Sequence, residues 1–544
     1  MDTDLEQQAI LIQALMNPAV YNNNEVSKCD LIETHVSWVI LTGCHAYKIK
    51  KPLNLGFLDF STLDKRKYYC EEELRLNRRL APTLYLGVIG ISGSPTDPTL
   101  HSLDNTESGN RDLDYFEYAV KMIQFPQDAQ LDRKLGSNKL LPQNIDTIAN
   151  MIADFHQNIR AADNLDQFGT PEHVMQPVRE NFTQIRDNLS KVDNLPQISQ
   201  LEEWCDSKYR ILKPLLKERK ARGFIRECHG DLHLRNLAWI NNAPLAFDCL
   251  EFNPDLYWID VINEIAFLVM DLDDHEQPAM AQRLLNSYLE KTGDYCGVAL
   301  LPFYLVYRAL VRAKVDAIRA KQSDVSSHDE KQILTEFKSY LDLAYIYTQN
   351  SSPCLIITRG LSGSGKTTKT QVLLETIKAI RIRSDVERKR LLGIKPENQP
   401  TLIEEGIYSQ DSTHKTYQKL YDLAGEILNS GYSVIVDATF LNLEKRSLFK
   451  KLAEINRLPF IILEFTATPE TLRKRVASRR NDASDADLAV LEAQLTRWQT
   501  LEEDEQIYTI SIDTEQQENL PLLIEKLESI CLQQARAEIP AHTH

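Results

Sequence analysis

One eight-residue segment, at positions 360–367, constrains this chain more than any other. It follows an apolar run at 354–358 and leads into a helix-like segment, so the local order is strand, loop and helix. It fits G-x-x-x-x-G-K-[ST], in which glycines let N–H groups surround phosphate oxygens, the lysine reaches the β- and γ-phosphates and the hydroxyl ligates Mg²⁺. A plain surface turn would leave the preceding strand and the Lys-Thr pair unexplained. The sequence therefore predicts a phosphate-binding loop made of Gly360, Leu361, Ser362, Gly363, Ser364, Gly365, Lys366 and Thr367.

Composition bounds the class of protein. A chain of 544 residues exceeds what one hydrophobic core usually supports, so we expect two or three domains. The formal net charge of −16 disfavours bulk binding to nucleic acid or anionic membranes, although a local basic site is compatible with it. Nine cysteines without a C-x-x-C pair favour reduced thiols, and there is no basic leader and no run of 18 apolar residues. We expect a cytoplasmic protein without a membrane segment.

The segment after the loop alternates between strands and helices. Further apolar strands are predicted at 380–382, 432–436, 460–465 and 507–512, with helices between them. This alternation predicts an α/β domain with a parallel sheet and the phosphate loop at the carboxyl ends of its strands. A polar stretch at 348–353 precedes the first strand, so we predict a boundary there, with domains at 1–348 and 349–544.

Polar residues at the strand ends of this second domain are candidates for chemistry. Asp437 is expected to help hold Mg²⁺, Asp385 to take the proton from an acceptor, and Arg388 to steady a phosphate or the acceptor; the two aspartates could exchange roles. Arg475 and Arg479 are spaced i and i+4 in a basic segment. Such a run is compatible with a solvated face, but beside a phosphate loop it favours a lid that closes over the nucleotide.

The first half carries a second constellation. A hairpin at 36–50 places Lys48 on a strand, and a charged helix with Glu73 follows; strands at 84–91 and 116–123 are separated by a polar loop at 92–114. Protein kinases carry H-x-D-x-x-x-x-N and a later metal-binding Asp, and the chain repeats this order at 229–236 and 248. Asp231 is the candidate base, Asn236 and Asp248 are candidate metal ligands, and Lys48 with Glu73 is the candidate ATP-binding ion pair.

Some assignments in this half stay open. Lys50 shares the face of Lys48, and Glu72 neighbours Glu73, so either member could form the pair. Asp260 is expected to brace the catalytic loop through hydrogen bonds, whereas Glu251 could brace it or act in chemistry. Residues 168–178 could shape an acceptor pocket or form a plain connection.

These motifs carry a family resemblance. The segment 229–236 with Asp248 resembles the aminoglycoside phosphotransferase and choline kinase superfamily, and together with the loop at 360–367 it resembles bacterial bifunctional aminoglycoside phosphotransferase/ATP-binding fusion proteins. The resemblance implies an N-terminal α+β, protein-kinase-like bilobal fold, with a small lobe at about 25–125 and a large lobe at about 126–348, and the use of ATP and Mg²⁺. Two departures are the lack of a glycine-rich loop before 36–41 and Cys249 in place of the Phe of D-F-G. The antibiotic substrate is not carried over.

The second half resembles the small phosphate-loop kinases related to polynucleotide kinase, gluconate kinase and zeta toxin. That resemblance rests on 360–367, on Asp385 and Arg388, and on the arginine-rich segment. It implies that Asp385 is the base and that Arg475 and Arg479 are catalytic. We predict two ATP-dependent kinase-type domains, each phosphorylating a hydroxyl of a small molecule. The alternative is a regulatory protein in which the N-terminal half senses ATP and controls the other half.

Overall fold

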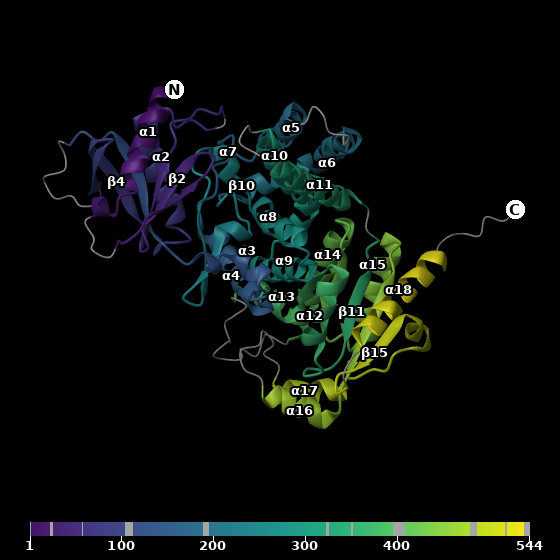
Figure 1. Ribbon diagram of the computed structural model, residues 1–544. Coiled ribbons are helices and arrows are strands. Elements are labelled where there is room, and N and C mark those ends of the chain that lie inside the picture. The colour runs from purple at the N-terminus through teal and green to yellow at the C-terminus, as the bar shows by residue number, and fades with distance from the viewer. Residues whose placement is uncertain are drawn as a thin grey trace. The chain divides into compact units, whose positions relative to one another are not determined.

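The computed structural model describes residues 2–21, 26–56, 58–103, 113–188, 195–321, 326–349, 352–394, 409–478, 487–516 and 519–537. By their contacts these residues form two compact units (Figure 1). The first unit is made of Met1–Asp271 and Lys314–Ser326, and the second of Leu272–Ala313 and Ser327–His544. Each unit contains its own main sheet.

An antiparallel sheet opens the first unit. Its six strands lie in the order β1 (Asp30–Glu33), β2 (Ser37–Leu41), β3 (His45–Lys50), β6 (Glu117–Ile123), β4 (Tyr85–Ser94) and β5 (Asp97–Ser102). Helix α1 (Asp2–Leu15) packs on one face, through a cluster that includes Leu11 and Ile49. Helix α2 (Leu63–Asn77) packs on the other face, through a cluster that includes Leu74 and Val120. A helix thus covers part of each face of the sheet, whereas all four residues of the edge strand β1 are exposed.

The prediction of a polar loop at 92–114 is wrong for its first part, where the structure has strands up to Ser102. Strand β4 continues to Ser94 and forms a hairpin with β5. Gly93, at φ +90°, takes part in this pairing opposite Pro98. A segment rich in Gly, Ser, Pro and Thr has the composition of a turn, and that composition hid the strand.

The rest of the first unit is mostly helical. Its helices are α3 (Leu131–Gly136), α4 (Pro142–Asn158), α5 (Pro171–Asn188), α6 (Leu195–Ala221), α7 (Pro254–Tyr257) and α8 (Val261–Asp274), which continues into the second unit. Two short antiparallel pairs, β7 (Ile225–Glu227) with β10 (Trp258–Asp260) and β8 (Leu237–Ile240) with β9 (Ala243–Ala246), flank residues 228–236. Helix α8 is buried along residues 261–272, as expected for a helix that is apolar on most sides. The kinase-like α+β fold is confirmed.

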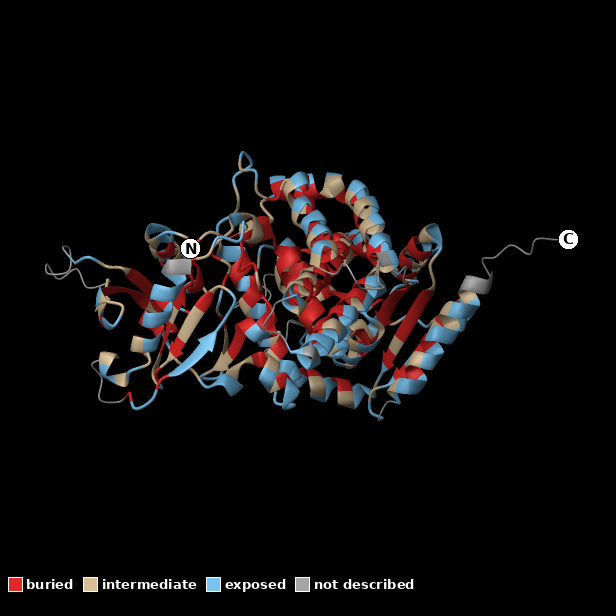
Figure 2. Ribbon diagram, turned by 45° about the horizontal axis from the view of Figure 1, so that its top comes forward, coloured by how far each residue is buried: buried red, intermediate tan, exposed pale blue. Residues whose placement is uncertain are grey.

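A parallel sheet forms the centre of the second unit. Its strand order is β12 (Ala379–Arg383), β13 (Ser433–Asp437), β11 (Leu355–Arg359), β14 (Phe460–Thr466) and β15 (Thr509–Asp513). All five residues of β11 are buried (Figure 2). Helices α12 (Lys366–Ile377) and α18 (Leu520–Ala537) share one apolar cluster with the sheet, and α14 (Gln410–Asn429) and α15 (Leu443–Asn456) contact each other and the sheet. The predicted α/β phosphate-loop domain is confirmed.

Short helices complete this unit at the ends of the strands. They are α13 (Ser384–Leu391), which follows β12 directly, and α16 (Pro469–Ala477) and α17 (Leu488–Thr496), which follow β14. Helices α16 and α17 contact each other through an apolar cluster that includes Leu361 of the loop at 360–367. The loop is therefore packed between its strand and these two helices.

Helices from the middle of the chain belong to the second unit by their contacts. These are α9 (Pro278–Thr292), the first part of α10 (Leu301–Ala320) and α11 (Ser327–Thr348). Helix α9 lies against α12 and the edge strand β12, where the Asn286 side chain donates to Ala379 O (3.0 Å) and accepts from Arg381 N (2.8 Å). The boundary at residue 349 stays a prediction.

One helical stretch is apolar and long enough to cross a membrane by length and composition. It is Tyr295–Ala320, and 72% of its most apolar window is buried inside the protein. No other helix among the described residues meets the same measure. Burial of this kind is also what a core helix of a folded domain shows.

Candidate active sites

The phosphate loop adopts a backbone that only glycine accommodates. Gly360 has φ +156°, and a Cβ there would lie 2.6 Å from Ser364 Oγ and 2.7 Å from the carbonyl oxygen of Phe465. Gly365, at φ +84°, is the N-cap of α12. The loop thus ends at a helix N-terminus, where backbone N–H groups without intrahelical partners favour a phosphate.

The two residues that follow the last glycine are placed for a nucleotide and its metal. Lys366 donates through Nζ to the carbonyls of Gly360 and Leu361, both at 2.9 Å, so its ammonium lies over the loop. The Thr367 hydroxyl donates to Asp437 Oδ2 at 2.7 Å. The sequence predicted that Thr367 and Asp437 share a metal, and the structure brings their oxygens together.

A pocket of about 1280 Å³ joins the loop to the predicted acceptor residues. Its walls include Lys366, Thr367, Asp437, Asp385 and Arg388. The last two form an ion pair, with Arg388 Nη1 3.0 Å from Asp385 Oδ1. One pocket therefore holds both the nucleotide-binding elements and the candidate base.

The arginine-rich segment reaches the loop through one of its two predicted residues. Arg475, on α16, donates to Gly363 O (3.3 Å), Thr514 Oγ1 (2.8 Å) and Thr514 O (3.0 Å), and it lines the pocket. Arg479 lies outside the described residues, and α16 as described ends at Ala477. The placement of Arg475 is that expected of a residue which closes over the phosphates.

Several residues that line this pocket were missed by the sequence reasoning. Tyr417 of α14, Lys445 of α15, and Gln494, Arg497 and Trp498 at the end of α17 all contribute. Gln494 accepts a hydrogen bond from the backbone N–H of Ser362 at 2.9 Å, so α17 holds the loop directly. These residues follow no spacing rule, and only the fold brings them to the site.

In the first unit, Glu73 forms the ion pairs that the sequence left open. It lies 2.9 Å from Lys48 and 2.6 Å from Lys50, whereas Glu72 pairs with Arg75. Burial opposes charge on Glu73, but the two lysines outweigh it and hold its pKa below the usual value. Glu73 therefore stays ionised and fixes both lysines of β3.

Each of these lysines has a second carboxylate partner. Lys48 reaches Asp248 at 2.5 Å, and Lys50 pairs with Glu251. Burial would lower the pKa of Lys48, but Asp248 and Glu73 raise it well above its usual value. Glu251 thus braces the strand through Lys50, while Lys48 joins Glu73 to the candidate metal ligand Asp248.

The catalytic-loop residues of the kinase-like unit also come together. Asn236 donates through Nδ2 to Asp231 Oδ2 (2.9 Å) and O (3.0 Å), and His233 Nε2 lies 3.3 Å from the Asp231 carboxylate. Asp231 is partly exposed, so an acceptor can reach it. Asp248 has φ +63°, a strained conformation for a residue other than glycine that is typical of functional sites.

Glu264, rather than Asp260, braces this loop. Its carboxylate accepts the backbone N–H groups of His229 (2.8 Å) and Gly230 (2.6 Å), and His156 Nε2 lies 3.3 Å away. These hydrogen bonds outweigh burial and lower the pKa of Glu264 to about 2. Asp260 instead forms a buried ion pair with Arg219 (2.7 Å) and caps α8, so its predicted role was wrong.

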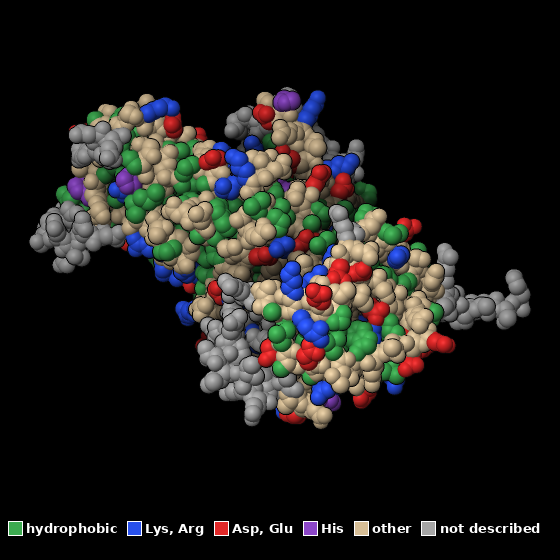
Figure 3. Space-filling model, turned by 90° about the horizontal axis from the view of Figure 1, so that it is seen from below, with side chains coloured by type: hydrophobic (Ala, Val, Ile, Leu, Met, Phe, Trp, Pro, Cys, Tyr) green, Lys and Arg blue, Asp and Glu red, His purple; other side chains and the backbone are tan. Residues whose placement is uncertain are grey.

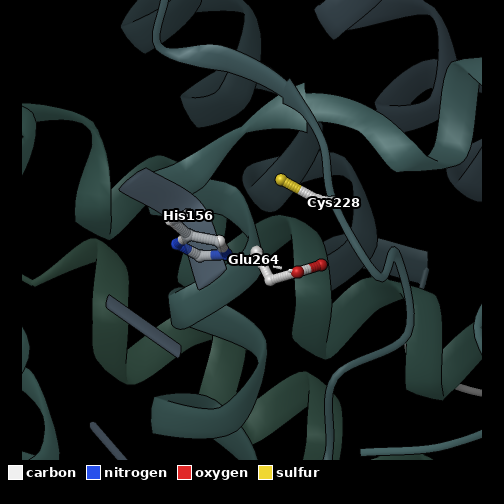
Figure 4. A group of neighbouring side chains, drawn as sticks. All are labelled: His156, Cys228 and Glu264. Carbon is white, nitrogen blue, oxygen red and sulfur yellow. Dashed lines mark hydrogen bonds and ion pairs between the residues drawn. The ribbon is translucent and has the colours of Figure 1, made fainter. Parts of the chain in front are cut away.

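The brace lies in a buried cluster of potential metal ligands (Figure 4). His156, Cys228 and Glu264 present ligand atoms within 4.8 Å of one another. Both carboxylate oxygens of Glu264 already accept hydrogen bonds, and Cys228 Sγ lies 3.7 Å from Ile259 O. This bonding accounts for the cluster as a support for the loop.

The residues present fit Mg²⁺ and a nucleotide triphosphate. Mg²⁺ prefers oxygen ligands, and the second unit offers the adjoining oxygens of Thr367 and Asp437. In the first unit Asn236, which contacts Asp231, offers an amide oxygen, and Asp248 offers a carboxylate oxygen beside Lys48, which can hold phosphates. Both donor sets match the chemistry of a metal–ATP complex.

Fold and sites together define a protein with two kinase-type domains. Residues 71–301 match the family described as Phosphotransferase enzyme family, and residues 355–501 match the family described as AAA domain. The chain is thus a fusion of an aminoglycoside phosphotransferase-type domain and a phosphate-loop kinase-type domain.

One curated protein is similar to this chain over most of its length, and solved structures are similar to parts of it. An uncharacterized protein of Mycobacterium tuberculosis is 29% identical over 476 residues, which cover 87% of this chain and 91% of that protein. Among solved structures, the amicoumacin kinase hAmiN is 12% identical, with 63% of this chain and 95% of that chain covered and a TM-score of 0.38. A sugar kinase from Janibacter sp. HTCC2649 is 19% identical, with 34% and 97% covered and a TM-score of 0.25. TM-scores this low support no argument about activity.

Proposed function

We propose that the protein is an ATP-dependent phosphotransferase in which each kinase-type domain transfers the γ-phosphate of ATP to a hydroxyl group of a small molecule. The observation that carries the proposal is the pocket of the second unit, where the phosphate loop, the Thr367–Asp437 pair and the Asp385–Arg388 pair share one cavity. A nucleotide-binding loop alone would suit hydrolysis as well. A carboxylate in the same cavity supplies the base that an acceptor hydroxyl needs.

In the second unit, the loop N–H groups and Lys366 bind the β- and γ-phosphates. Mg²⁺, held by Thr367 and Asp437, would neutralise charge on the phosphates. Asp385 accepts the proton of the acceptor hydroxyl while that oxygen forms its bond to phosphorus and ADP leaves with the electrons of the broken bond. Arg475, which already contacts the loop, stabilises the charge on the transferring group.

In the first unit, Asp231 accepts the hydroxyl proton, and its orientation is set by Asn236 and by the braced backbone at Gly230. Lys48, fixed by Glu73, binds the phosphates, and Asn236 with Asp248 would hold the metal. Nearly all catalysis of this type comes from positioning and charge neutralisation. Substitution of Asp231, Asp248 or Lys48 is therefore expected to lower the rate of phosphoryl transfer in this unit severely.

We also propose a cytoplasmic location. All nine cysteines are free thiols in the structure, and six of them are buried, which suits a reducing compartment. The proposed acceptors are small hydroxyl compounds of metabolism, which are found in the same compartment as ATP.

The test compares two variants of the full-length protein, Asp231→Asn and Lys366→Ala. We expect wild type to bind two molecules of a non-hydrolysable ATP analogue per chain and to turn over ATP only with Mg²⁺. Each variant should lose the turnover of its own unit and keep that of the other. If Asp231→Asn leaves every phosphoryl transfer unchanged while two nucleotides still bind, the first unit is an ATP sensor and the proposal fails for that half.

A further inference from the structure

The pocket of the second unit is larger than one nucleotide requires. Its volume is about 1280 Å³, whereas sites for one small ligand usually span about 300–1,000 Å³. The phosphate loop and Arg475 mark the nucleotide end. Beyond Asp385, the walls come from α13, α14 and the start of α15, and these helices bound the space left for the acceptor.

The charge of this lining opposes that of the whole protein. Among the described residues, six lysines and arginines line the pocket against three carboxylates, in a chain whose net charge is −16. On the face of the molecule drawn in Figure 3, basic and acidic side chains are instead interspersed. The excess of positive charge is therefore a property of the pocket and not of the protein at large.

Most of these cations already contact other groups of the protein. Lys366 and Arg475 serve the nucleotide end, Arg383 pairs with Glu290 at 2.8 Å, and Arg388 pairs with Asp385. Lys445 and Arg497 differ, because no carboxylate among the described residues forms an ion pair with either. The Lys445 ammonium lies 5.3 Å from the ring centroid of Tyr417.

Tyr417 lines the pocket together with Lys445 and the candidate base Asp385. The ring is buried, and its hydroxyl accepts a hydrogen bond from the backbone N–H of Phe440 at 3.2 Å. Burial raises the pKa of Tyr417, and the charges of Arg388 and Asp385 act on the same hydroxyl. Lys445 and Arg388 thus line the same pocket as this ring and Asp385.

We propose that the acceptor phosphorylated in this pocket carries an oxyanion, a phosphate or a carboxylate, which Lys445 and Arg388 bind so that a hydroxyl of the same molecule lies at Asp385. This inference rests on the proposed kinase function of the unit. Charge-assisted hydrogen bonds from an ammonium and a planar guanidinium are the strongest that a protein offers to an oxyanion. Arg388 keeps its contact with Asp385, because a guanidinium has five N–H donors.

The experiment uses the full-length protein saturated with Mg²⁺ and AMP-PNP, so that the phosphate loop is filled. Inorganic phosphate is then titrated by calorimetry, with glycerol as the neutral probe. We expect wild type to bind phosphate, Lys445→Gln to weaken that binding by about tenfold or more, and Lys445→Arg to restore it. Glycerol binding should not depend on Lys445.

The matched control is Lys415→Gln, since Lys415 is an exposed lysine of α14 that pairs with Asp411 at 2.7 Å. It should bind phosphate as wild type does. Equal phosphate affinity in wild type and Lys445→Gln would overturn the inference, as would the absence of phosphate binding to the nucleotide-saturated wild type.

Failure of the proposed function has a separate readout. If the wild type shows no transfer of labelled phosphate that depends on Lys366, the kinase assignment fails, whatever the phosphate titration gives. If that transfer occurs while Lys445→Gln binds phosphate normally, only the anionic acceptor is refuted.

Discussion

The ion pairs of Glu290 should stabilise strand β12 and helix α13, which form the acceptor side of the phosphate-loop site. Glu290 on α9 lies 2.8 Å from Arg383 Nη1 and 3.7 Å from Arg381 Nη2, and its backbone carbonyl accepts from Arg390 at 2.5 Å. Arg381 in turn donates to the carbonyl of Thr367 at 2.9 Å. Glu290→Gln keeps the shape of the side chain and removes its charge.

The expected loss of stability in Glu290→Gln follows from the burial of Glu290 and its two arginine partners. Arg381 and Arg383 expose only 7% and 12% of their side chains, and Glu290 exposes 23%. Removal of one partner from a buried ion pair costs about 3–5 kcal/mol, and the partial exposure of Glu290 places the expected cost at about 2–3 kcal/mol. That cost corresponds to a rise of about 30- to 150-fold in local opening.

Hydrogen exchange of the peptide that covers β12 and α13 measures this opening. We expect backbone amides of residues 379–391 to exchange faster by that factor in Glu290→Gln. The control, Asp411→Asn, removes an exposed pair on α14 and should change stability by less than about 0.5 kcal/mol. Equal exchange in the two variants would refute the reasoning that α9 supports the acceptor strand.

Three further predictions concern the two sites. Gly360→Ala places a Cβ 2.6 Å from Ser364 Oγ and should lower the ATP affinity of the second unit by more than about tenfold, as measured by calorimetry. The control is Gly393→Ala, where φ is +70° but the space around the Cβ is open, and it should cost only about 1–2 kcal/mol of stability. The pKa of Glu264 falls from 4.5 to about 2 on folding, so the contribution of Glu264 to folding stability is present above pH 4.5 and is lost as the pH falls through about 2. Glu264→Gln should therefore remove up to about 3 kcal/mol of this acid-sensitive stability. Denaturation measured from pH 7 downward checks the loss. Asp437→Asn, made in the Asp231→Asn background, should raise the Mg²⁺ concentration for half-maximal ATP turnover by about 10- to 100-fold, and an unchanged Mg²⁺ dependence would remove Asp437 from the metal site.

Local signals predicted the parts of the fold that depend on local chemistry. The loop at 360–367 fixes its own conformation through glycines at positive φ, and the apolar strands beside it are buried on both faces, so both could be found from the sequence. The catalytic loop at 229–236 was found for the same reason, because its residue types and spacing are set by the chemistry.

Partners that are distant in the chain could not be predicted. Glu264 binds the backbone N–H groups of His229 and Gly230, 35 and 34 residues earlier, and a carboxylate in an apolar helix does not say which N–H groups it meets. The same holds for Asn286, whose partner Ala379 lies 93 residues away. Apolar periodicity shows that a face is buried but not what covers it.

The position of Lys445 was hidden for a different reason. From the sequence, a lysine in the first turn of a helix such as α15 is expected to be solvated. Its contact with Tyr417 arises only because α14 and α15 pack side by side. The charge of a pocket is a sum over side chains from several elements. It becomes visible only after folding.

The fate of the γ-phosphate tests the central claim most directly. ³¹P NMR of wild type with ATP, Mg²⁺ and a mixture of small hydroxyl metabolites should show new phosphomonoester resonances as ATP is consumed. One set should be absent in Lys366→Ala, another in Asp231→Asn, and all in the double variant. Conversion of ATP to ADP and inorganic phosphate alone, or the same phosphomonoester products in the double variant as in wild type, would contradict the account.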